Sequence, residues 1–337
     1  MFERTYQCTR WLLVGPNLFG SLRNQCRFHR FDRAQIRSRL IKYSTPRGAQ
    51  PSGPLTLRRI DSVPLRPPKD LWKALGFTAV VGGVTFTFAI ISDFERSKRR
   101  IRRYWNDAME MFGSVQRKYQ FYESSFSDGQ KSSLIIIALN AVVFAMWKLK
   151  ALEPLMWRWF TNSFCSKSLC FPMVLSAFSH SNWLHLGVNM YVLYSFAGVS
   201  IDRFLGMSQF AAFYITAAVI SSFTSLVHKC VVRSPSRALG ASGAILAVLA
   251  YTCVMIPDAR LQIIFLPVFD FSAQTAVISL LLFDLLGLLL RFRLFDHSAH
   301  LGGTLFGIFY GLYGERIIWR EYGNKVIKFY RKITGPG

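Results

Sequence analysis

The sequence predicts an all-α polytopic membrane protein in which one helix precedes a bundle of six. Two properties of its 337 residues favour this fold class: 51% of them are hydrophobic, and the mean hydropathy is +0.25 although the formal net charge is +23. A third is a set of seven apolar stretches separated by charged or polar segments. So many apolar residues exclude an intrinsically disordered chain, and six cysteines are too few for a small disulfide-stabilised domain. Soluble nucleic-acid-binding proteins are seldom both this cationic and this hydrophobic, so we expect no nucleic-acid partner.

A large part of the positive charge lies in residues 1–69, where twelve Arg and two Lys are opposed by three acidic residues. An Arg-rich, acid-poor segment with scattered apolar residues is typical of a mitochondrial presequence. Six prolines between residues 46 and 68 then indicate a linker without a packed core. A basic arm that binds nucleic acid is the alternative. The presequence is favoured because a strongly apolar domain follows.

Seven apolar stretches supply the helices of the predicted bundle. A helix needs ~20 mainly apolar residues to cross a bilayer, because lipid offers no hydrogen-bond partners to the backbone. The stretches that fit are 71–92, 133–147, 183–199, 207–227, 240–256, 273–290 and 298–313. The predicted organisation is a presequence and linker at 1–69, an extra transmembrane helix at 70–92, a charged spacer at 93–131, a six-helix core at 132–314 and a basic tail at 315–337.

Polar side chains cluster at the starts of three core helices. Such residues are costly inside a membrane, so they are functional candidates. The clusters are His180, His185 and Asn189 in the second core helix, Gly240-Ala241-Ser242-Gly243 in the fourth, and His297 with His300 in the sixth. Because His185 and Asn189 are four residues apart, they share one helix face.

Ser242 and His300 have the chemistry of a nucleophile and its base. A serine hydroxyl attacks a carbonyl once a base takes its proton, and histidine is the usual base. At a helix start, the backbone N–H of Ser242 lacks an intrahelical partner and can face a developing oxyanion. No carboxylate is assigned to orient His300, which favours a Ser-His dyad over a triad.

Small residues predict that the fourth and sixth core helices pack closely. Gly303 and Gly307 are four residues apart in the sixth helix, and Gly243 and Ala247 have the same spacing in the fourth. Small residues in this pattern let two helix backbones approach. If these faces meet, the hydroxyl and the imidazole come within hydrogen-bond reach.

These motifs, in their order and spacing, resemble those of the rhomboid intramembrane serine proteases over residues 133–313, and the strings GASGAI, IIFLP and FDHSAHLGG are similar to those of mitochondrial members. The resemblance implies a 1+6 rhomboid fold, with Ser242 as nucleophile and His300 as general base and acid. It assigns oxyanion and substrate-binding roles to His185, Asn189, His180 and Gly240, and helix packing to Gly243, Gly303 and Gly307. The expected partners are the lipid bilayer of the mitochondrial inner membrane and single-pass substrates within it. No cofactor or metal is expected.

The sequence departs from the family pattern beside the proposed nucleophile. Many bacterial members carry a Tyr one turn after the serine, where it stacks on the catalytic imidazole, and Leu246 stands at this position. Another group must therefore orient His300. The segment Met156–Phe160 is loosely similar to the Trp-Arg motif of the family's first loop.

Four further residues carry expectations of their own. His297 is expected to be a structural histidine at a helix start, and Asp284 to pair with a neighbouring polar group rather than act in catalysis. Cys165 and Cys170 could form a disulfide if their side of the membrane is oxidising.

Two other functions stay open from the sequence. A membrane metalloenzyme would use His180, His185, His297 and His300 to hold zinc or iron, although no Cys or carboxylate accompanies them at metal-ligand spacing. A catalytically inactive rhomboid-like scaffold is the other, and the presence of both dyad residues argues against it. A presequence would place the N-terminus in the matrix. Seven membrane spans would then place the C-terminus in the intermembrane space. The basic run at 96–103, after the first span, does not fit a simple positive-inside arrangement.

Overall fold

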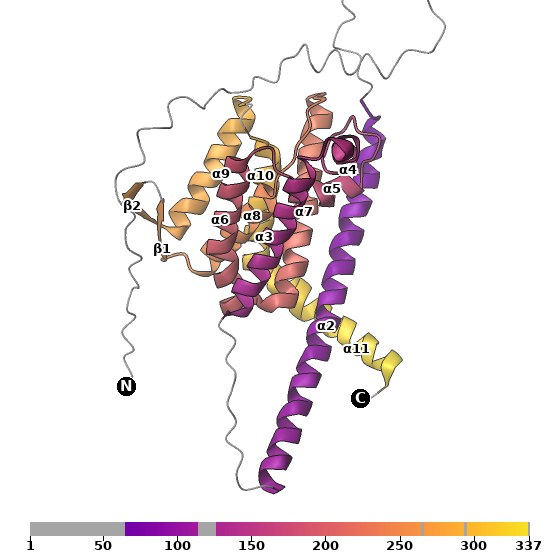
Figure 1. Ribbon diagram of the computed structural model, residues 1–337, viewed down its shortest axis with the longest axis vertical. Helices are drawn as coiled ribbons and strands as arrows, with labels where there is room; N and C mark the ends of the chain where they lie inside the picture. Colours follow the sequence, from indigo (N-terminus) through magenta and orange to yellow (C-terminus); the bar gives the residue numbers. More distant parts are fainter. Residues whose placement is uncertain (1–64, 114–125, 264–265, 293–294, 336–337) are drawn as a thin grey trace, which may run out of the picture. The chain divides into compact units, whose positions relative to one another are not determined.

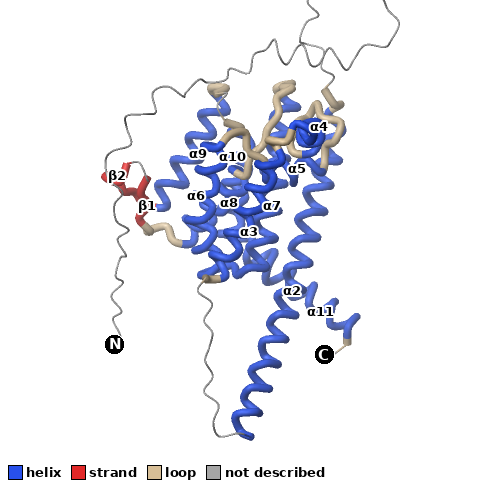
Figure 2. Tube along the Cα trace, in the orientation of Figure 1, coloured by secondary structure: helices blue, strands red, loops and turns tan. Residues whose placement is uncertain are grey.

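The computed structural model describes residues 65–113, 126–263, 266–292 and 295–335. The presequence and nearly all of the linker predicted at 1–69 lie outside these residues. The described chain is helical except for one hairpin (Figure 2). The main helices are α2 (Leu71–Gly113), α3 (Asp128–Met146), α4 (Glu153–Trp159), α5 (Phe171–Leu175), α6 (Trp183–Ser200), α7 (Gly206–Val231), α8 (Ser242–Met255), α9 (Ala273–Leu289), α10 (His297–Phe309) and α11 (Gly323–Thr334). All seven predicted apolar stretches are helical over most of their length, which confirms the all-α membrane class.

Helix α2 continues past the predicted end at residue 92 to Gly113 (Figure 1). The basic run after residue 93 is rich in Arg, Lys and Glu, which are good helix formers, so the helix extends beyond the apolar part. The first half of the predicted charged spacer is therefore helical, whereas residues 114–125 lie outside the described chain. At the other end, Asp70 forms ion pairs with Arg66 (3.0 Å) and Lys73 (2.9 Å).

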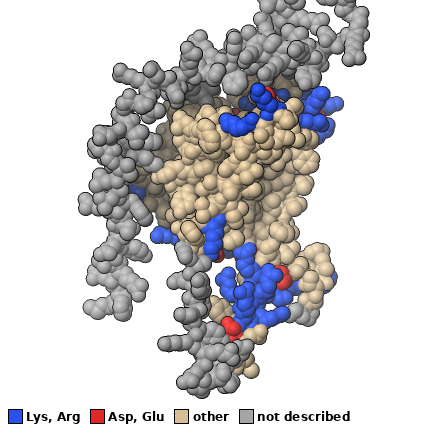
Figure 3. All heavy atoms as spheres, viewed as in Figure 1, with Lys and Arg blue, Asp and Glu red and all other residues tan. Residues whose placement is uncertain are grey.

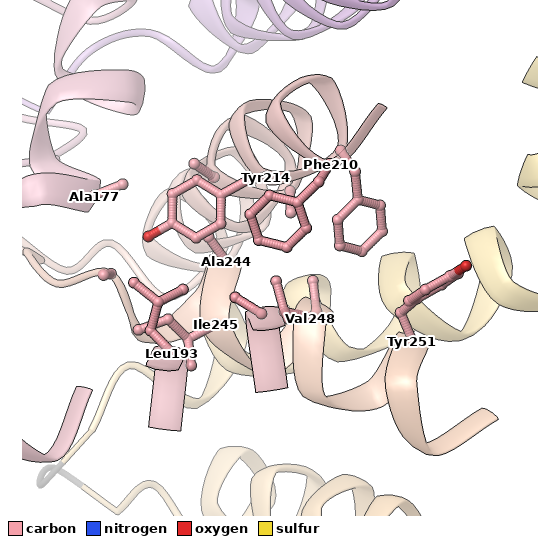
Figure 4. Packing of buried hydrophobic residues seen from close by; sticks show 14 of the residues in the cluster. Ala177, Leu193, Phe210, Tyr214, Ala244, Ile245, Val248 and Tyr251 are labelled. Carbon is pink, nitrogen blue, oxygen red and sulfur yellow. The ribbon is translucent and has the colours of Figure 1, made fainter. Parts of the chain in front are cut away.

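The core of the bundle surrounds α8, which contacts α6, α7, α9 and α10. Helix α8 has 14 residues and is about 21 Å long at ~1.5 Å per residue, less than the ~30 Å apolar thickness of a bilayer. Its central position makes this length sufficient, because neighbouring helices cover it. Figure 4 shows Ala244, Ile245 and Val248 of α8 facing Phe210 and Tyr214 of α7.

Helices α8 and α10 meet backbone to backbone, as their small residues predict. A methyl group added to Gly303 would overlap the carbonyl of Gly243, and one added to Gly307 would overlap the carbonyl of Ala247. Side chains larger than hydrogen therefore do not fit at these two positions unless the helices separate. The predicted close packing is confirmed.

Three further features of the fold were not predicted. Strands β1 (Arg260–Ile263) and β2 (Leu266–Ser272) form an antiparallel hairpin between α8 and α9, with Arg260 and Asp270 in an ion pair of 3.1 Å. The helix α10 also continues as a π-helix, η7 (Tyr310–Tyr322), into α11, so the predicted basic tail at 315–337 is helical as far as Thr334. A second π-helical turn, η6 (Ile201–Leu205), links α6 to α7.

The surface of the described helices is suited to lipid. Three helical stretches are long and apolar enough to cross a membrane, Pro68–Met109, Asp128–Met146 and Trp183–Val231, while α8 and α9 are apolar but shorter. On the face shown in Figure 3, Lys and Arg gather toward the two ends of the bundle, and most of the band between them shows no charged side chain. Exposed Val, Leu, Ile and Phe side chains of α2, α3 and α9 contribute to this apolar surface.

Cys165 and Cys170, which could have formed a disulfide, are free cysteines in the structure. Burial raises the pKa of both thiols, which favours their protonated, unreactive form.

We expect Gly307→Ala to lower the free energy of unfolding by about 1–3 kcal/mol, the usual cost of overpacking a tight interface. Thermal unfolding of the purified protein in detergent measures the change. Gly76→Ala is the matched control, because a methyl group at Gly76 meets nothing within 4 Å. Equal stability of both variants would contradict the close α8–α10 contact.

Candidate active site

Ser242 is the first residue of α8, and a short extended segment leads into it. Gly240 in this segment has φ +137°, a conformation that favours glycine. Its N–H donates to the carbonyl of Ser176 at 2.9 Å. Two residues earlier, Ala238 and Asn162 exchange backbone hydrogen bonds of 2.8 Å in an isolated antiparallel bridge. The loop between α3 and α6 therefore fixes the chain just before the serine.

His300 lies in the first turn of α10, which is capped and anchored by Asp296. The Asp296 carboxylate accepts from the backbone N–H of Ala299 at 3.1 Å, so it satisfies an N–H that the first helical turn leaves open. It also accepts from Ser225 of α7 at 2.6 Å and pairs with Lys229 of α7 at 2.9 Å. These bonds tie the start of α10 to the end of α7.

The hydroxyl Oγ of Ser242 lies 2.7 Å from Nε2 of His300, although the residues are 58 positions apart in the chain. The close packing of α8 against α10 through their small residues therefore brings the hydroxyl and the imidazole into hydrogen-bond contact. Ser221 of α7 lies between the two helices, and its hydroxyl donates to the carbonyl of Ala299 at 2.9 Å. Both Ser242 and His300 are half-buried, which leaves them accessible to a reactant.

His185 of α6 lies beside this pair, whereas His180, which precedes α6, and Asn189 of α6 make other contacts. The ring of His185 is close to Gly240: a methyl group on Gly240 would lie 3.1 Å from Nε2 of His185 and 3.7 Å from Oγ of Ser242. His180 is 1% exposed, and its ring packs edge-on against His185 with centroids 4.9 Å apart. One amide N–H of Asn189 donates to the carbonyl of His185 at 2.7 Å. One of the two amide hydrogens of Asn189 is therefore already used in a hydrogen bond within α6.

A buried carboxylate that the sequence did not assign to the site lies near His300. Asp284 of α9 is 1% exposed, and its Oδ1 lies 2.8 Å from Nδ1 of His297 and 3.4 Å from Nδ1 of His300. The predicted pairing of Asp284 with a polar neighbour is confirmed, and that neighbour is His297. Asp284 was not predicted as a neighbour of His300, because only the packing of α9 against α10 brings the two residues together.

Phe295 supplies the aromatic contact that the Leu246 position lacks. Its ring centroid is 5.9 Å from that of His300, with an interplanar angle of 34°. This residue was not predicted, because it precedes α10 rather than following Ser242.

The Met156–Phe160 segment forms the end of α4, with Phe160 as the residue that follows the helix. Trp157 packs edge-on against Trp147 (5.4 Å between centroids), and its carbonyl accepts from Arg237 at 2.9 Å. Arg237 precedes Ala238, so this segment also contacts the chain that leads to Ser242.

Metal ligation has little geometric basis in the described part of the chain. No group of three or more His, Cys, Asp or Glu side chains there is placed to hold one metal ion.

Comparison with known proteins identifies the family. A model of the rhomboid domain matches residues 156–316. The chain is 42% identical over 280 residues to the "Presenilin-associated rhomboid-like protein, mitochondrial" of Rattus norvegicus, an alignment covering 80% of this chain and 74% of the rat protein. The chain belongs to the rhomboid family.

Other relatives of this rhomboid are also mitochondrial. It is 41% identical over 280 residues to the Homo sapiens protein of the same name, covering 80% of this chain and 73% of the human protein. It is 32% identical over 194 residues to "Rhomboid protein 1, mitochondrial" of Saccharomyces cerevisiae, covering 55% of this chain and 54% of the yeast protein. Together with the apolar helices, these relatives support a mitochondrial membrane protein of the rhomboid protease type.

Gly240→Ala should slow the reaction of Ser242 with a serine-directed fluorophosphonate probe by about tenfold or more, since ~1.4 kcal/mol of added barrier corresponds to a factor of ten. The added methyl group meets the His185 ring and forces an unfavourable backbone conformation. The labelling rate measured by intact-protein mass spectrometry checks this. Gly198→Ala, where a methyl group meets nothing within 4 Å, should label like the parent protein, and equal rates for both variants would contradict the prediction.

Proposed function

We propose that this rhomboid is an intramembrane serine endopeptidase of the mitochondrial inner membrane, which cleaves transmembrane segments of single-pass proteins with Ser242 and His300. The observation that carries the proposal is the 2.7 Å contact between Oγ of Ser242 and Nε2 of His300. A nucleophile and a base at this separation are placed for proton transfer.

In the first step, Oγ of Ser242 attacks the carbonyl carbon of the scissile bond while Nε2 of His300 takes the hydroxyl proton. The resulting imidazolium then protonates the leaving amine, and the peptide bond breaks to give an acyl-enzyme. In the second step, His300 takes a proton from water, which attacks the acyl group and releases Ser242. This sequence needs no cofactor, because each proton that His300 takes is returned to a leaving group.

The oxyanion of each tetrahedral intermediate needs donors that are already in place. The backbone N–H of Ser242 is one, since it belongs to the first turn of α8 and has no partner within the helix. His185 is the side-chain donor best placed for this task, because its ring borders Gly240 next to the serine. Asn189 becomes a second donor through the remaining hydrogen of its amide.

The substrate has to present an extended peptide bond to this site. A helix shields its backbone through internal hydrogen bonds, so a transmembrane segment must unwind locally before it is cut. Small or helix-breaking residues near the cleavage point lower the cost of this unwinding. We therefore propose single-pass segments with such residues as the substrate class.

Ser242→Ala and His300→Ala are each expected to abolish cleavage of a single-pass substrate by the purified protein in liposomes, because each removes one half of the proton-transfer pair. Gel analysis of the cleaved substrate provides the measurement. Chelators should leave the activity of the parent protein unchanged. Loss of activity with chelators and retention in Ser242→Ala would instead favour the metalloenzyme, and a parent protein that neither cleaves nor labels with a fluorophosphonate would favour an inactive scaffold.

His185→Ala should lower kcat by about 10²–10³, the usual effect of losing one oxyanion donor. Asn189→Ala should lower it less, because one amide hydrogen of Asn189 is already bonded to the carbonyl of His185. Steady-state kinetics on one substrate ranks the two variants. A larger loss in Asn189→Ala would show that the side chain turns toward the oxyanion during the reaction.

A further inference from the structure

Asp284 is a buried carboxylate that the reaction described above does not use. It projects from the middle of α9, where its side chain is 1% exposed. A lone charge in such a position is costly, so it requires partners that donate hydrogen bonds or carry positive charge. The partners that the structure provides are two imidazoles of α10, those of His297 and His300, and both face the same oxygen, Oδ1.

His297 holds the carboxylate in a fixed position. Its Nδ1 lies 2.8 Å from Oδ1 of Asp284, and its own ring is tightly enclosed. A methyl group on Gly287 would lie 2.5 Å from three ring atoms of His297, and Phe283 packs edge-on against the ring with centroids 5.3 Å apart. Gly287 therefore makes room for His297 on α9, one turn after Asp284. The carboxylate is positioned before any reaction begins.

The position of Asp284 favours one tautomer of His300 over the other. Nδ1 of His300 lies 3.4 Å from Oδ1 of Asp284. If Nδ1 were bare, its lone pair would face a carboxylate oxygen and the two would repel. With the proton on Nδ1, the contact is attractive and Nε2 is left bare, 2.7 Å from the hydroxyl of Ser242. Only this tautomer allows Nε2 to take the serine proton.

We propose that Asp284 is a positioning residue for His300, which selects the Nδ1–H tautomer and stabilises the imidazolium that forms when Ser242 attacks. The unit is then Ser242, His300 and Asp284, with His297 as the anchor of the carboxylate. The inference rests on the proposed protease function. The 3.4 Å separation shortens when His300 becomes positively charged, since catalytic contacts commonly tighten only as charge develops.

Other charged or titratable groups around this cluster are placed differently. His185 of α6 borders Gly240, next to Ser242. The Lys229–Asp296 ion pair joins α7 to the start of α10, and its two charges compensate each other at 2.9 Å. Among the residues that the structure describes, Asp284 is the carboxylate in contact with Nδ1 of His300.

The test compares Asp284→Asn with Asp202→Asn in liposomes. Asp202 accepts hydrogen bonds from Ser127 (2.7 Å) and Gly129 (2.8 Å) at the start of α3. It follows the C-terminal end of α6, whereas His185 lies in the first turn of that helix, so its substitution removes a structural carboxylate away from the site. We expect Asp284→Asn to lower kcat by at least about 10²-fold with KM nearly unchanged, as loss of the orienting carboxylate does in serine proteases. Asp202→Asn should change the thermal unfolding temperature but not kcat. Retention of kcat within threefold in folded Asp284→Asn overturns the proposal.

The second measurement does not require activity. Nitrogen-15 NMR of histidine-labelled protein reports the tautomer of each ring, and the His300 signals are assigned by their disappearance in His300→Gln. The expected result for the parent protein is a protonated Nδ1 and a bare Nε2 on His300, with Nδ1–H partly lost in Asp284→Asn. A protonated Nε2 in the parent protein overturns the proposal even if Asp284→Asn fails to fold. Cleavage of substrate by Ser242→Ala would overturn the protease assignment. The NMR result would still decide whether Asp284 selects the tautomer of His300.

Discussion

The backbone contact between α8 and α10 is the constraint on which the rest of the site depends. Ser242 begins one of these helices and His300 lies in the first turn of the other, so their separation follows from how closely the helix axes approach. Gly303 against Gly243 and Gly307 against Ala247 allow that approach. In lipid, helix association gains little from hydrophobic burial, so direct packing of small residues sets the distance. The reactive pair is therefore a consequence of helix packing, not of a loop.

Around this contact, each side chain of the site is supported from a different helix. Helix α6 contributes His185, helix α7 contributes the ion pair that anchors α10, and helix α9 contributes Asp284. The loop between α3 and α6 fixes the residues before Ser242 through the Asn162–Ala238 bridge. Because these supports come from elements far apart in sequence, the site exists only when the whole bundle is assembled.

The parts of the fold and site that the sequence predicts are those with local signatures. Apolar length predicts the helices, and the four-residue spacing of small residues predicts the α8–α10 contact. The hairpin between α8 and α9 was missed because residues 260–272 are short and lack a strong alternation. The extension of α2 was missed because a charged helix has no apolar face to reveal it. Asp284 was missed as a neighbour of His300 because only the packing of α9 against α10 brings the two together. Phe295 was missed because the aromatic partner was sought after Ser242 and not before α10.

The double use of Asp296 has a consequence for how the molecule comes apart. This carboxylate caps α10 and, at the same time, binds Ser225 and Lys229 near the C-terminal end of α7. Fraying of the first turn of α10 would therefore also break its anchor to α7, and release of α7 would uncap α10. Because one carboxylate makes both sets of contacts, we expect the two events to occur together and to move His300 away from Ser242. Local opening of this end of α10 would then also remove the reactive contact between His300 and Ser242.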